Sequence, residues 1–404
     1  MLSDVYFPRV NGVSTSIQTF RREFRQLGHD IQVIAPDYGQ ATADEEGICR
    51  VLSRRVLFDP EDRMMRPKSL SRHLAALNGQ HFDLVHIQTP FVAHYAGLRW
   101  ARRWGVPCVE TYHTFFEEYL FHYLPVLPKT AWRAVARLLS RRQCNHLDGL
   151  VVPSRAMREI LAGYGVTTPM RVIPTGMPGD AFQEGDGAAF RARLGIAAGQ
   201  PTLVFVGRVA FEKNIEFLLR VVRELQRTTH PEVVLIIAGE GPAEGRLRRL
   251  GTQLGLDANL RFAGYLPRGL ELNSGYQAGD AFVFASRTET QGLVLLEAMS
   301  LGVPVVSTAV MGTCDILAAG QGALVAEEDV AQFAAQVRRV LDDAELRQRL
   351  SAEGRDYARQ WAAEGPAQAL LAFYEDLQSG RPSPPSSIAD GPCHHSTGNS
   401  SEKS

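Results

Sequence analysis

Short, nearly continuous apolar runs alternate along this chain with longer stretches in which apolar residues recur every three or four positions. The first pattern is typical of strands buried on both faces, and the second of amphipathic helices. Their alternation predicts an α/β fold built on parallel sheets. The predicted strands are 31–35, 84–87, 106–111, 149–152, 171–173, 202–207, 233–238, 260–263, 281–285 and 303–307, and the clearest helices are 14–27, 215–227 and 243–254.

A glycine-rich stretch between residues 175 and 200 divides this pattern into two halves. We expect a first domain over 1–176, a linker over 177–200 and a second domain over 201–355. The two Rossmann-like, doubly wound domains would face each other across a cleft, with ligands at the carboxyl ends of the strands. Residues 379–404 are rich in Ser, Pro and Gly, which predicts a disordered tail.

The first eight residues have the character of the end of a strand whose beginning is missing. Either the true start lies upstream of Met1, or the first domain has only half of a central strand.

One segment of the second half contains candidate ligand-binding residues. A buried strand at 281–285 leads into a polar turn with Glu289 and Gly292, and a helix with Glu297 follows at once. Unpaired amides at a helix N-terminus suit a phosphate group. A carboxylate on each side of such a phosphate could accept hydrogen bonds from the hydroxyls of two sugars, as a nucleotide-sugar requires.

This segment resembles the signature of glycosyltransferase family 4, the retaining GT-B enzymes, in which two Glu are separated by seven residues. Glu289 and Glu297 have that spacing, and the flanking strings 292–294, 297–299 and 302–306 match as well. The resemblance continues to about residue 375. It implies a GT-B fold in which a helix over 356–378, from the expected helix pair at 353–378, returns to the first domain.

Two cations follow the strand at 202–207, namely Arg208 and Lys213. Arg offers a bidentate fork to phosphate and Lys a point charge. The resemblance implies that they hold the donor diphosphate and stabilise charge on the departing phosphate. From spacing alone, a solvated loop with a salt bridge to Glu212 is the alternative.

The resemblance assigns further roles. His113 follows the strand at 106–111 and is expected to contact the transferred sugar; with Arg208, Lys213 and Glu289 it forms the expected catalytic set. Gly12, after Asn11, is expected to let the backbone approach the donor. Tyr265 is a candidate backbone contact for the base. The complete expected donor site comprises Gly12, Arg208, Lys213, Tyr265, Glu289, Thr290, Gln291, Gly292, Leu293 and Glu297.

No Asp-x-Asp pair occurs, so we expect neither a metal nor another cofactor, with the cations and helix-start amides in their place. In this family the leaving phosphate is thought to help deprotonate the acceptor. The five Cys form no metal or redox motif, which fits a reducing cytoplasm. No apolar run reaches the roughly 20 residues of a spanning helix, so any membrane contact is expected to be peripheral.

Charge is unevenly distributed. Residues 1–180 carry 22 Lys and Arg against 17 Asp and Glu, whereas the remainder is acidic. Lys129, Arg133, Arg137 and Arg141 form one stripe of a predicted helix, and Trp132, Val135, Leu138 and Leu139 another face. Such a helix can lie on an anionic membrane through segment 129–142, on the inner face of the cell membrane. An ordinary packed helix is the alternative. A second basic and partly apolar segment contains Arg54, Arg55, Arg63, Met64, Met65, Arg66, Lys68 and Arg72.

Two strings, at 112–123 and 288–292, are similar to the bacterial branch that glucosylates diacylglycerol, with Gln291 where mannosyltransferases more often have Phe. We therefore expect transfer of a hexose, glucose from UDP-glucose, to a lipid. The partners are then a nucleotide-sugar and a lipid or sugar acceptor, with no nucleic acid. Alternatives are a GDP-mannose-dependent mannosyltransferase, an NAD(P)-dependent oxidoreductase based on Gly239 and Gly241, and an inactive nucleotide-sugar sensor.

Overall fold

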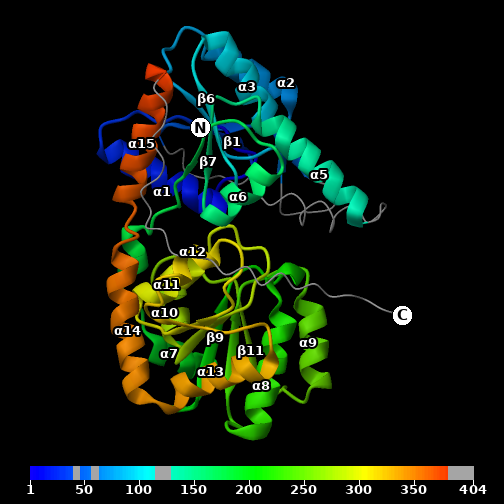
Figure 1. The fold of residues 1–404 in the computed structure, drawn as a ribbon, viewed down its shortest axis with the longest axis vertical. Helices are drawn as coiled ribbons and strands as arrows, with labels where there is room; N and C mark the ends of the chain where they lie inside the picture. Colours follow the sequence, from blue (N-terminus) through cyan, green and yellow to red (C-terminus); the bar gives the residue numbers. More distant parts are fainter. Residues whose placement is uncertain (40–45, 56–62, 114–128, 381–404) are drawn as a thin grey trace.

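The computed structural model describes residues 1–39, 46–55, 63–113 and 129–380. Two α/β lobes are stacked in Figure 1, with two long helices running along one side of both. All strand pairs in the two main sheets are parallel. This is the GT-B arrangement of two Rossmann-like domains expected from the sequence.

The first domain is built around six parallel strands. Leu2 forms bridges to Ile34 and to Ile87, and so joins a two-stranded part of the sheet to a four-stranded part. The strands are β1 (Val33–Pro36), β2 (Ile48–Val51), β5 (Val85–Ile87), β6 (Cys108–Thr111), β7 (Gly149–Val152) and β8 (Met170–Val172). The helices are α1 (Gly12–Gln26), α2 (Pro67–Ala76), α3 (Val92–Trp104), α5 (Lys129–Cys144) and α6 (Arg155–Gly163).

The second domain has a six-stranded sheet in the order β11-β10-β9-β12-β13-β14. Its strands are β9 (Thr202–Val206), β10 (Val234–Ala238), β11 (Leu260–Gly264), β12 (Ala281–Phe284), β13 (Val305–Ser307) and β14 (Ala323–Val325). Its helical elements are η1 (Gly179–Phe182), α7 (Gly187–Arg193), η2 (Phe211–Lys213), α8 (Ile215–Thr228), α9 (Glu244–Gln253), α10 (Leu270–Gln277), α11 (Leu293–Ser300), α12 (Thr313–Leu317), α13 (Val330–Asp342) and α14 (Ala344–Arg359).

The central strands of this sheet are apolar throughout because helices cover both faces. Every residue of β9, β10 and β12 is buried. Phe282 lies between Tyr276 and Phe284, and Phe284 stacks on Phe205 with ring centroids 5.9 Å apart. This core fixes the strand ends from which the site loops leave.

The last helix, α15 (Glu364–Ser379), lies on the first domain, whereas α14 packs on α11 of the second. Phe373 is fully buried with Phe20 and Phe24 of α1. The hydroxyl of Tyr374 lies 2.5 Å from Nδ1 of His86, and burial holds the pKa of that imidazole well below its usual value. The expected helix pair at 353–378 corresponds to the end of α14 and to α15, and the returning helix expected over 356–378 is α15, which begins at Glu364.

Three sequence-based expectations differ from the structure. Part of the second basic segment forms a hairpin of β3 (Ser53–Arg55) and β4 (Arg63–Met65), in which Met65 is fully buried and belongs to the core. Strands β2 and β14 were not expected, because β2 is interrupted by Arg50 and β14 is only three residues long with one buried residue. Ser379, which was expected in the tail, is the last residue of α15; residues 381–404 lie outside the described residues.

Candidate active site

The candidate site lies where the carboxyl ends of the strands of both sheets meet (Figure 1). The loop after β12 contacts the first domain, since the Thr290 hydroxyl donates to the carbonyl of His113 at 3.4 Å. Arg155, at the start of α6, bonds through its backbone amide to Asp315 of α12 at 2.6 Å. These two contacts place the loops after β6 and β12, and the starts of α6 and α12, at the boundary between the domains.

Lys213 and Glu289 form an ion pair in this boundary. The Lys213 ammonium, in the short helix η2 after β9, lies 2.5 Å from a carboxylate oxygen of Glu289, in the loop after β12. Each side chain is about one-fifth exposed. The structure therefore joins two of the expected catalytic residues directly, and Glu212 is not the partner of Lys213.

The loop that carries Arg208 is interlocked with the turn after β10. The Val209 amide donates to the carbonyl of Glu240, and the Ala243 amide donates back to that of Val209. A β-carbon at Gly239 would lie 1.9 Å from the carbonyl oxygen of Gly207. The glycines at 239 and 241 thus serve a close backbone approach within the protein, which holds the half-buried Arg208 in place.

Gly292 begins α11 in the left-handed region, at a φ of +97°, which favours glycine. Leu293, half-buried, is the first helical residue. The backbone amides at this end of α11 remain the expected contacts for a donor phosphate.

Glu297, on α11, is paired with protein groups. One carboxylate oxygen accepts from Arg268 at 3.1 Å, and the other accepts from the hydroxyl of Tyr276 at 2.6 Å. Burial and the charge of Glu297 raise the pKa of Tyr276 well above its ordinary value, so this phenol stays protonated. The role of Glu297 toward sugar hydroxyls stays a prediction.

Gln291 turns away from the start of α11 and toward the linker. Its side-chain oxygen accepts from the Thr175 amide at 2.9 Å, and its side-chain nitrogen donates to the Thr175 carbonyl at 2.8 Å. Both side chains are buried. The donor contact expected for Gln291 stays a prediction.

His113 follows β6 and is held by Gln88. Its Nε2–H donates to the Gln88 side-chain oxygen at 2.9 Å. Burial lowers its pKa to about 4, so the imidazole is neutral near pH 7. In this tautomer Nδ1 is an acceptor, which suits a sugar hydroxyl better than proton donation.

Gly12 and Tyr265 have open surroundings. Gly12 is exposed at the start of α1, and no described atom lies within 4 Å of a β-carbon placed there. Asn11 caps the helix by accepting from the Ser14 amide at 2.9 Å. Tyr265 is 48% exposed, and its amide faces the Glu240 carboxylate at 3.4 Å. Their expected donor contacts stay predictions.

A basic cavity of about 480 Å³ spans the two domains beside Arg268. Along α1 it is lined by Arg21, Arg22 and Arg25, and on the other side by Pro178 and Asp180.

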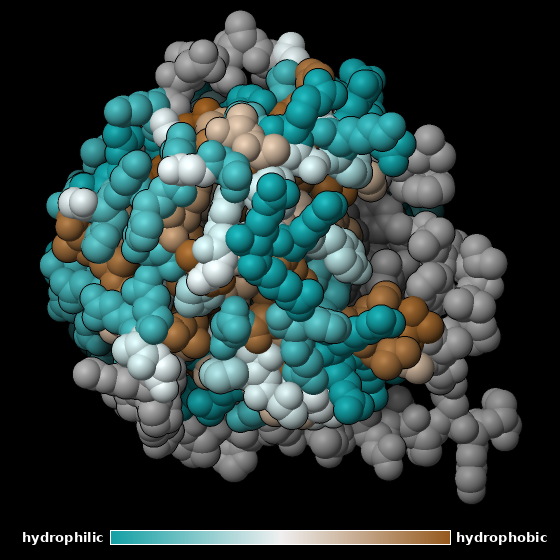
Figure 2. Space-filling model, turned by 90° about the horizontal axis from the view of Figure 1, so that it is seen from above, coloured by the Kyte–Doolittle hydropathy of each residue, from teal (hydrophilic) through white to brown (hydrophobic). Residues whose placement is uncertain are grey.

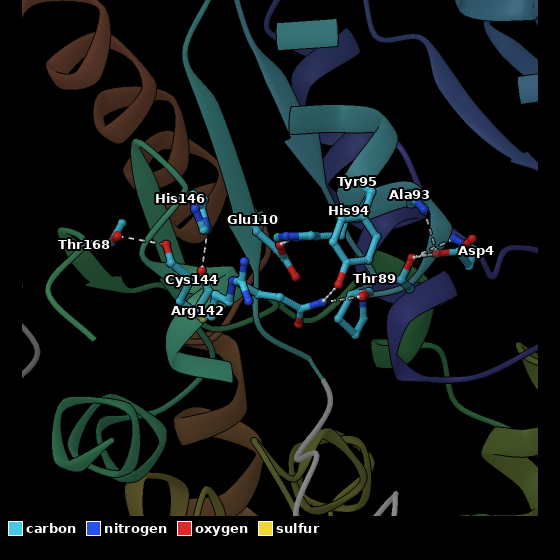
Figure 3. Close-up of polar contacts among 12 residues, drawn as sticks. Asp4, Thr89, Ala93, His94, Tyr95, Glu110, Arg142, Cys144, His146 and Thr168 are labelled. Atoms are coloured by element: carbon cyan, nitrogen blue, oxygen red, sulfur yellow. Dashed lines mark hydrogen bonds and ion pairs between the residues drawn. The ribbon is translucent and has the colours of Figure 1, made fainter. Parts of the chain in front are cut away.

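A buried polar cluster, which sequence reasoning missed, lies in the first domain (Figure 3). Asp4 accepts from the Thr89 hydroxyl at 2.9 Å and from the Ala93 amide at 3.0 Å, at the start of α3. Beside it, Nδ1 of His94 lies 2.5 Å from a carboxylate oxygen of Glu110. Burial raises the pKa of Asp4 to about 6. Asp4 was not singled out because nothing in the sequence places it beside Ala93.

Helix α5 presents apolar and basic side chains to solvent together. Leu138 is 64% exposed, Leu139 41% and Val135 38%. Arg133 and Arg141 are exposed on the same helix, while the guanidinium of Arg137 lies over the ring of Tyr164. Figure 2 shows hydrophobic atoms beside hydrophilic ones on the side where α5 projects in Figure 1. The side chain of Trp132 and residues 114–128 lie outside the described residues.

No helix among the described residues is long and apolar enough to span a bilayer. The same residues contain no cluster of three or more His, Cys, Asp or Glu side chains suited to a metal ion.

Comparison with known proteins gives consistent results for both domains. Residues 10–179 match the family model "Glycosyltransferase Family 4", and residues 186–357 match "Glycosyl transferases group 1". The chain is 30% identical over 316 residues to the alpha-monoglucosyldiacylglycerol synthase of Streptococcus pneumoniae, covering 76% of this chain and 70% of the relative.

Two further similarities extend this result. A GDP-mannose-dependent alpha-mannosyltransferase of Mycobacterium tuberculosis is 30% identical over 78% of this chain and 80% of its own length. The structure of a sucrose-phosphate synthase from Thermosynechococcus elongatus superposes with a TM-score of 0.76 at 20% identity, covering 94% of this chain and 98% of that one. At that identity the structural match supports the fold alone.

Proposed function

Because this chain belongs to the GT-B glycosyltransferases, with a family 4 domain followed by a group 1 domain, we propose that it transfers glucose from UDP-glucose to a lipid hydroxyl. The proposed acceptor is diacylglycerol, and the proposed reaction retains the anomeric configuration and needs no metal. The observation that carries the proposal is the Lys213–Glu289 pair at the boundary between the domains. A lipid acceptor is supported by the 30% identity to a synthase that is named for glucosylated diacylglycerol.

The proposed chemistry follows from charge. Breaking the bond between the sugar and the diphosphate leaves negative charge on the departing phosphate oxygen. Lys213, oriented by Glu289, and Arg208 would stabilise that charge in a partly desolvated site, where such stabilisation is largest. The departing phosphate would then accept the proton of the acceptor hydroxyl. Neutral His113 would accept a hydrogen bond from the transferred sugar.

Transfer of labelled glucose from UDP-glucose to diacylglycerol in vesicles tests the proposal. We expect Arg208→Ala and Lys213→Ala each to lower kcat by about 10²–10³, the loss typical for one charge-stabilising group. Arg220→Ala is the matched control, because Arg220 is 52% exposed on α8 and only weakly paired. Unchanged transfer after replacement of both Arg208 and Lys213 would contradict the proposed role of these cations.

A GDP-mannose donor is the second candidate, because the mycobacterial mannosyltransferase matches this chain at the same identity. Thermal shift with UDP, GDP, UDP-glucose and GDP-mannose separates the two. A ligand at 100 times its dissociation constant stabilises the folded state by about 2.7 kcal/mol. Stabilisation by the guanine compounds alone would exclude UDP-glucose as the donor.

We also propose that α5 holds the enzyme on an anionic membrane. Its exposed Leu138 and Leu139 would enter the interface while Arg133 and Arg141 contact lipid phosphates. Leu138→Ser with Leu139→Ser should reduce sedimentation with phosphatidylglycerol vesicles. Leu270→Ser is the matched control, because Leu270 is 62% exposed on α10 of the second domain. Equal binding by all three proteins would refute the proposed contact.

A further inference from the structure

Residues 173–177 connect the sheet of the first domain to the second domain and are called the linker below. Three alternate residues of this linker are held by hydrogen bonds. The Ile173 amide continues the sheet of the first domain by donating to the carbonyl of Val152. Two residues on, both peptide groups of Thr175 bond to the side chain of Gln291. After two more residues, Met177 exchanges hydrogen bonds with the carbonyl of Trp361 and the amide of Ala363.

The middle attachment differs from the other two because a side chain makes it. The primary amide of Gln291 pairs with one N–H and one C=O of the same residue, as a neighbouring strand would. These groups are buried, so removing the amide leaves a donor and an acceptor without partners. Each such loss costs about 1–3 kcal/mol, more than the net gain from an average hydrogen bond.

The attachment continues into the first domain. The Thr175 hydroxyl donates to the hydroxyl of Ser16 at 2.9 Å, and Ser16 is 1% exposed on α1. Ser16 lies about one turn beyond Gly12, where α1 begins. A continuous buried chain of hydrogen bonds thus joins α1, the linker and the loop after β12.

The loop that contains Glu289, Thr290 and Gln291 is itself held against the second domain. The Gly312 amide donates to the carbonyl of Glu289 at 2.9 Å, and a β-carbon at Gly312 would lie 2.1 Å from the carbonyl oxygen of Thr290. Residues 289–291 therefore have little freedom to move separately from the second domain. A displacement of the Gln291 side chain is therefore expected to displace the backbone of Glu289 as well.

We propose that Gln291 is a positioning residue, the fixed pivot at which the linker couples the angle between the domains to the placement of Glu289. This inference rests on the proposed function for its link to catalysis, but not for its structural content. Because both amide atoms are bonded to Thr175, Gln291 acts through the linker and not through contact with the donor. Together with the Thr290–His113 and Arg155–Asp315 contacts, this amide sets the angle between α1 and the Glu289 loop, and among the described residues it alone joins that loop by hydrogen bonds to the linker and to α1.

Replacing Gln291 by Leu tests the pivot, because Leu keeps much of the volume and removes both hydrogen bonds. The matched control is Gln277→Leu. The Gln277 amide also bonds to two backbone groups, accepting from Gly185 at 2.7 Å and donating to Leu301 at 3.4 Å, but far from Thr175 and Ser16. Both variants should lose stability. Only Gln291→Leu should change the relation between the domains.

Three measurements on the full chain give the outcome. In X-ray scattering with and without UDP, Gln291→Leu should have a larger radius of gyration than the wild type or Gln277→Leu. Hydrogen exchange at the Thr175 amide should accelerate at least tenfold. The kcat for sugar transfer should fall at least tenfold while KM for the donor changes less than threefold. Ser16→Ala, which removes only the last bond of the chain, should show the same changes to a smaller extent.

If the scattering and the hydrogen exchange of Gln291→Leu were identical to those of the wild type, the proposal would be overturned. A rise in the KM for the donor without any other change would also overturn it, because it would make Gln291 a donor contact. If Gln291→Leu does not fold, unchanged exchange at Thr175 and unchanged kcat in Ser16→Ala would overturn it instead. Scattering and exchange do not depend on turnover. A wild-type protein that transfers no sugar would contradict the proposed function, while these two measurements still decide whether Gln291 is the pivot.

Discussion

Asp4 is a buried carboxylate of the first domain. It is 6% exposed, and its raised pKa of about 6 comes mainly from burial, opposed by the bonds from Ala93 and Thr89. A raised carboxyl pKa stabilises the folded state when the group is protonated. That contribution is complete below the unfolded value near 3.8 and is lost as pH rises through about 6.

Asp4→Asn should therefore alter how stability depends on pH. Asn keeps an oxygen for the Ala93 amide and removes the buried charge. A difference between a pKa of 3.8 and about 6 corresponds to about 3 kcal/mol, at about 1.4 kcal/mol for each unit. The variant should exceed the wild type by up to that amount in free energy of unfolding at pH 8 and by little at pH 4. Urea titrations at both values measure this, and parallel curves would argue against a buried charge.

Arg268 determines whether Glu297 is accessible. Its guanidinium lies 3.1 Å from that carboxylate and is 26% exposed beside the basic cavity. Arg268→Ala should leave the Tyr276 bond in place and open one carboxylate oxygen to solvent. If Glu297 contacts the donor, this variant should bind UDP or GDP without a large loss of affinity, whereas Glu297→Gln should weaken binding. Calorimetric titration compares the two variants, and equal weakening of binding would contradict a donor contact made by Glu297 alone.

At the scale of single elements, the start of α11 depends on a backbone shape that L-residues seldom adopt. Gly292 has a φ of +97°, and an added β-carbon would lie 2.8 Å from Cδ1 of Leu295 and 3.0 Å from Cγ2 of Thr313.

Gly292→Ala should lower the free energy of unfolding by about 2 kcal/mol, since a strained backbone conformation costs about 1–3 kcal/mol. Gly163→Ala is the opposite control. It lies in α6 with nothing within 4 Å of an added β-carbon, so it should gain about 0.5–1 kcal/mol. Denaturant titration of the two proteins is sufficient. A Gly292→Ala variant as stable as the wild type would show that the loop can relax.

The elements also show what the sequence can predict. Continuous apolar runs located β9, β10 and β12 to within one or two residues, because strands buried on both faces have few polar positions. Strand β2 and the β3–β4 hairpin have mixed, partly exposed residues and were missed. The site loops could be located from the sequence because they follow predicted strands. The hydrogen-bond partners of their side chains could not be predicted, because the bonds of Glu297 to Arg268 and of Gln291 to Thr175 depend on tertiary packing.

At the scale of the whole molecule, the chain returns from the second domain to the first through α15. Phe373 of α15 is fully buried against α1 and β7, although its neighbours in sequence follow the second domain. Arg171 reinforces this contact by its ion pair with Asp376 at 2.8 Å.

Phe373→Ala should destabilise the first domain by about 3–5 kcal/mol, the usual cost of removing a buried Phe side chain. The second domain has a separate core and should be much less affected. Calorimetry should therefore show one unfolding transition shifted to lower temperature and separated from the other. A uniform shift of a single transition would instead mean that the domains unfold as one unit.

The return of α15 to the first domain also sets an order for events during synthesis. The sheet of the first domain ends at Val172, but the helix that covers Phe20 and Phe24 ends at Ser379. A ribosome adding about 5–20 residues per second needs roughly 10–40 s for the intervening stretch of about 200 residues. During that interval the nascent first domain exposes the aromatic surface that α15 later covers, so chaperones that bind apolar surface would have their main opportunity there.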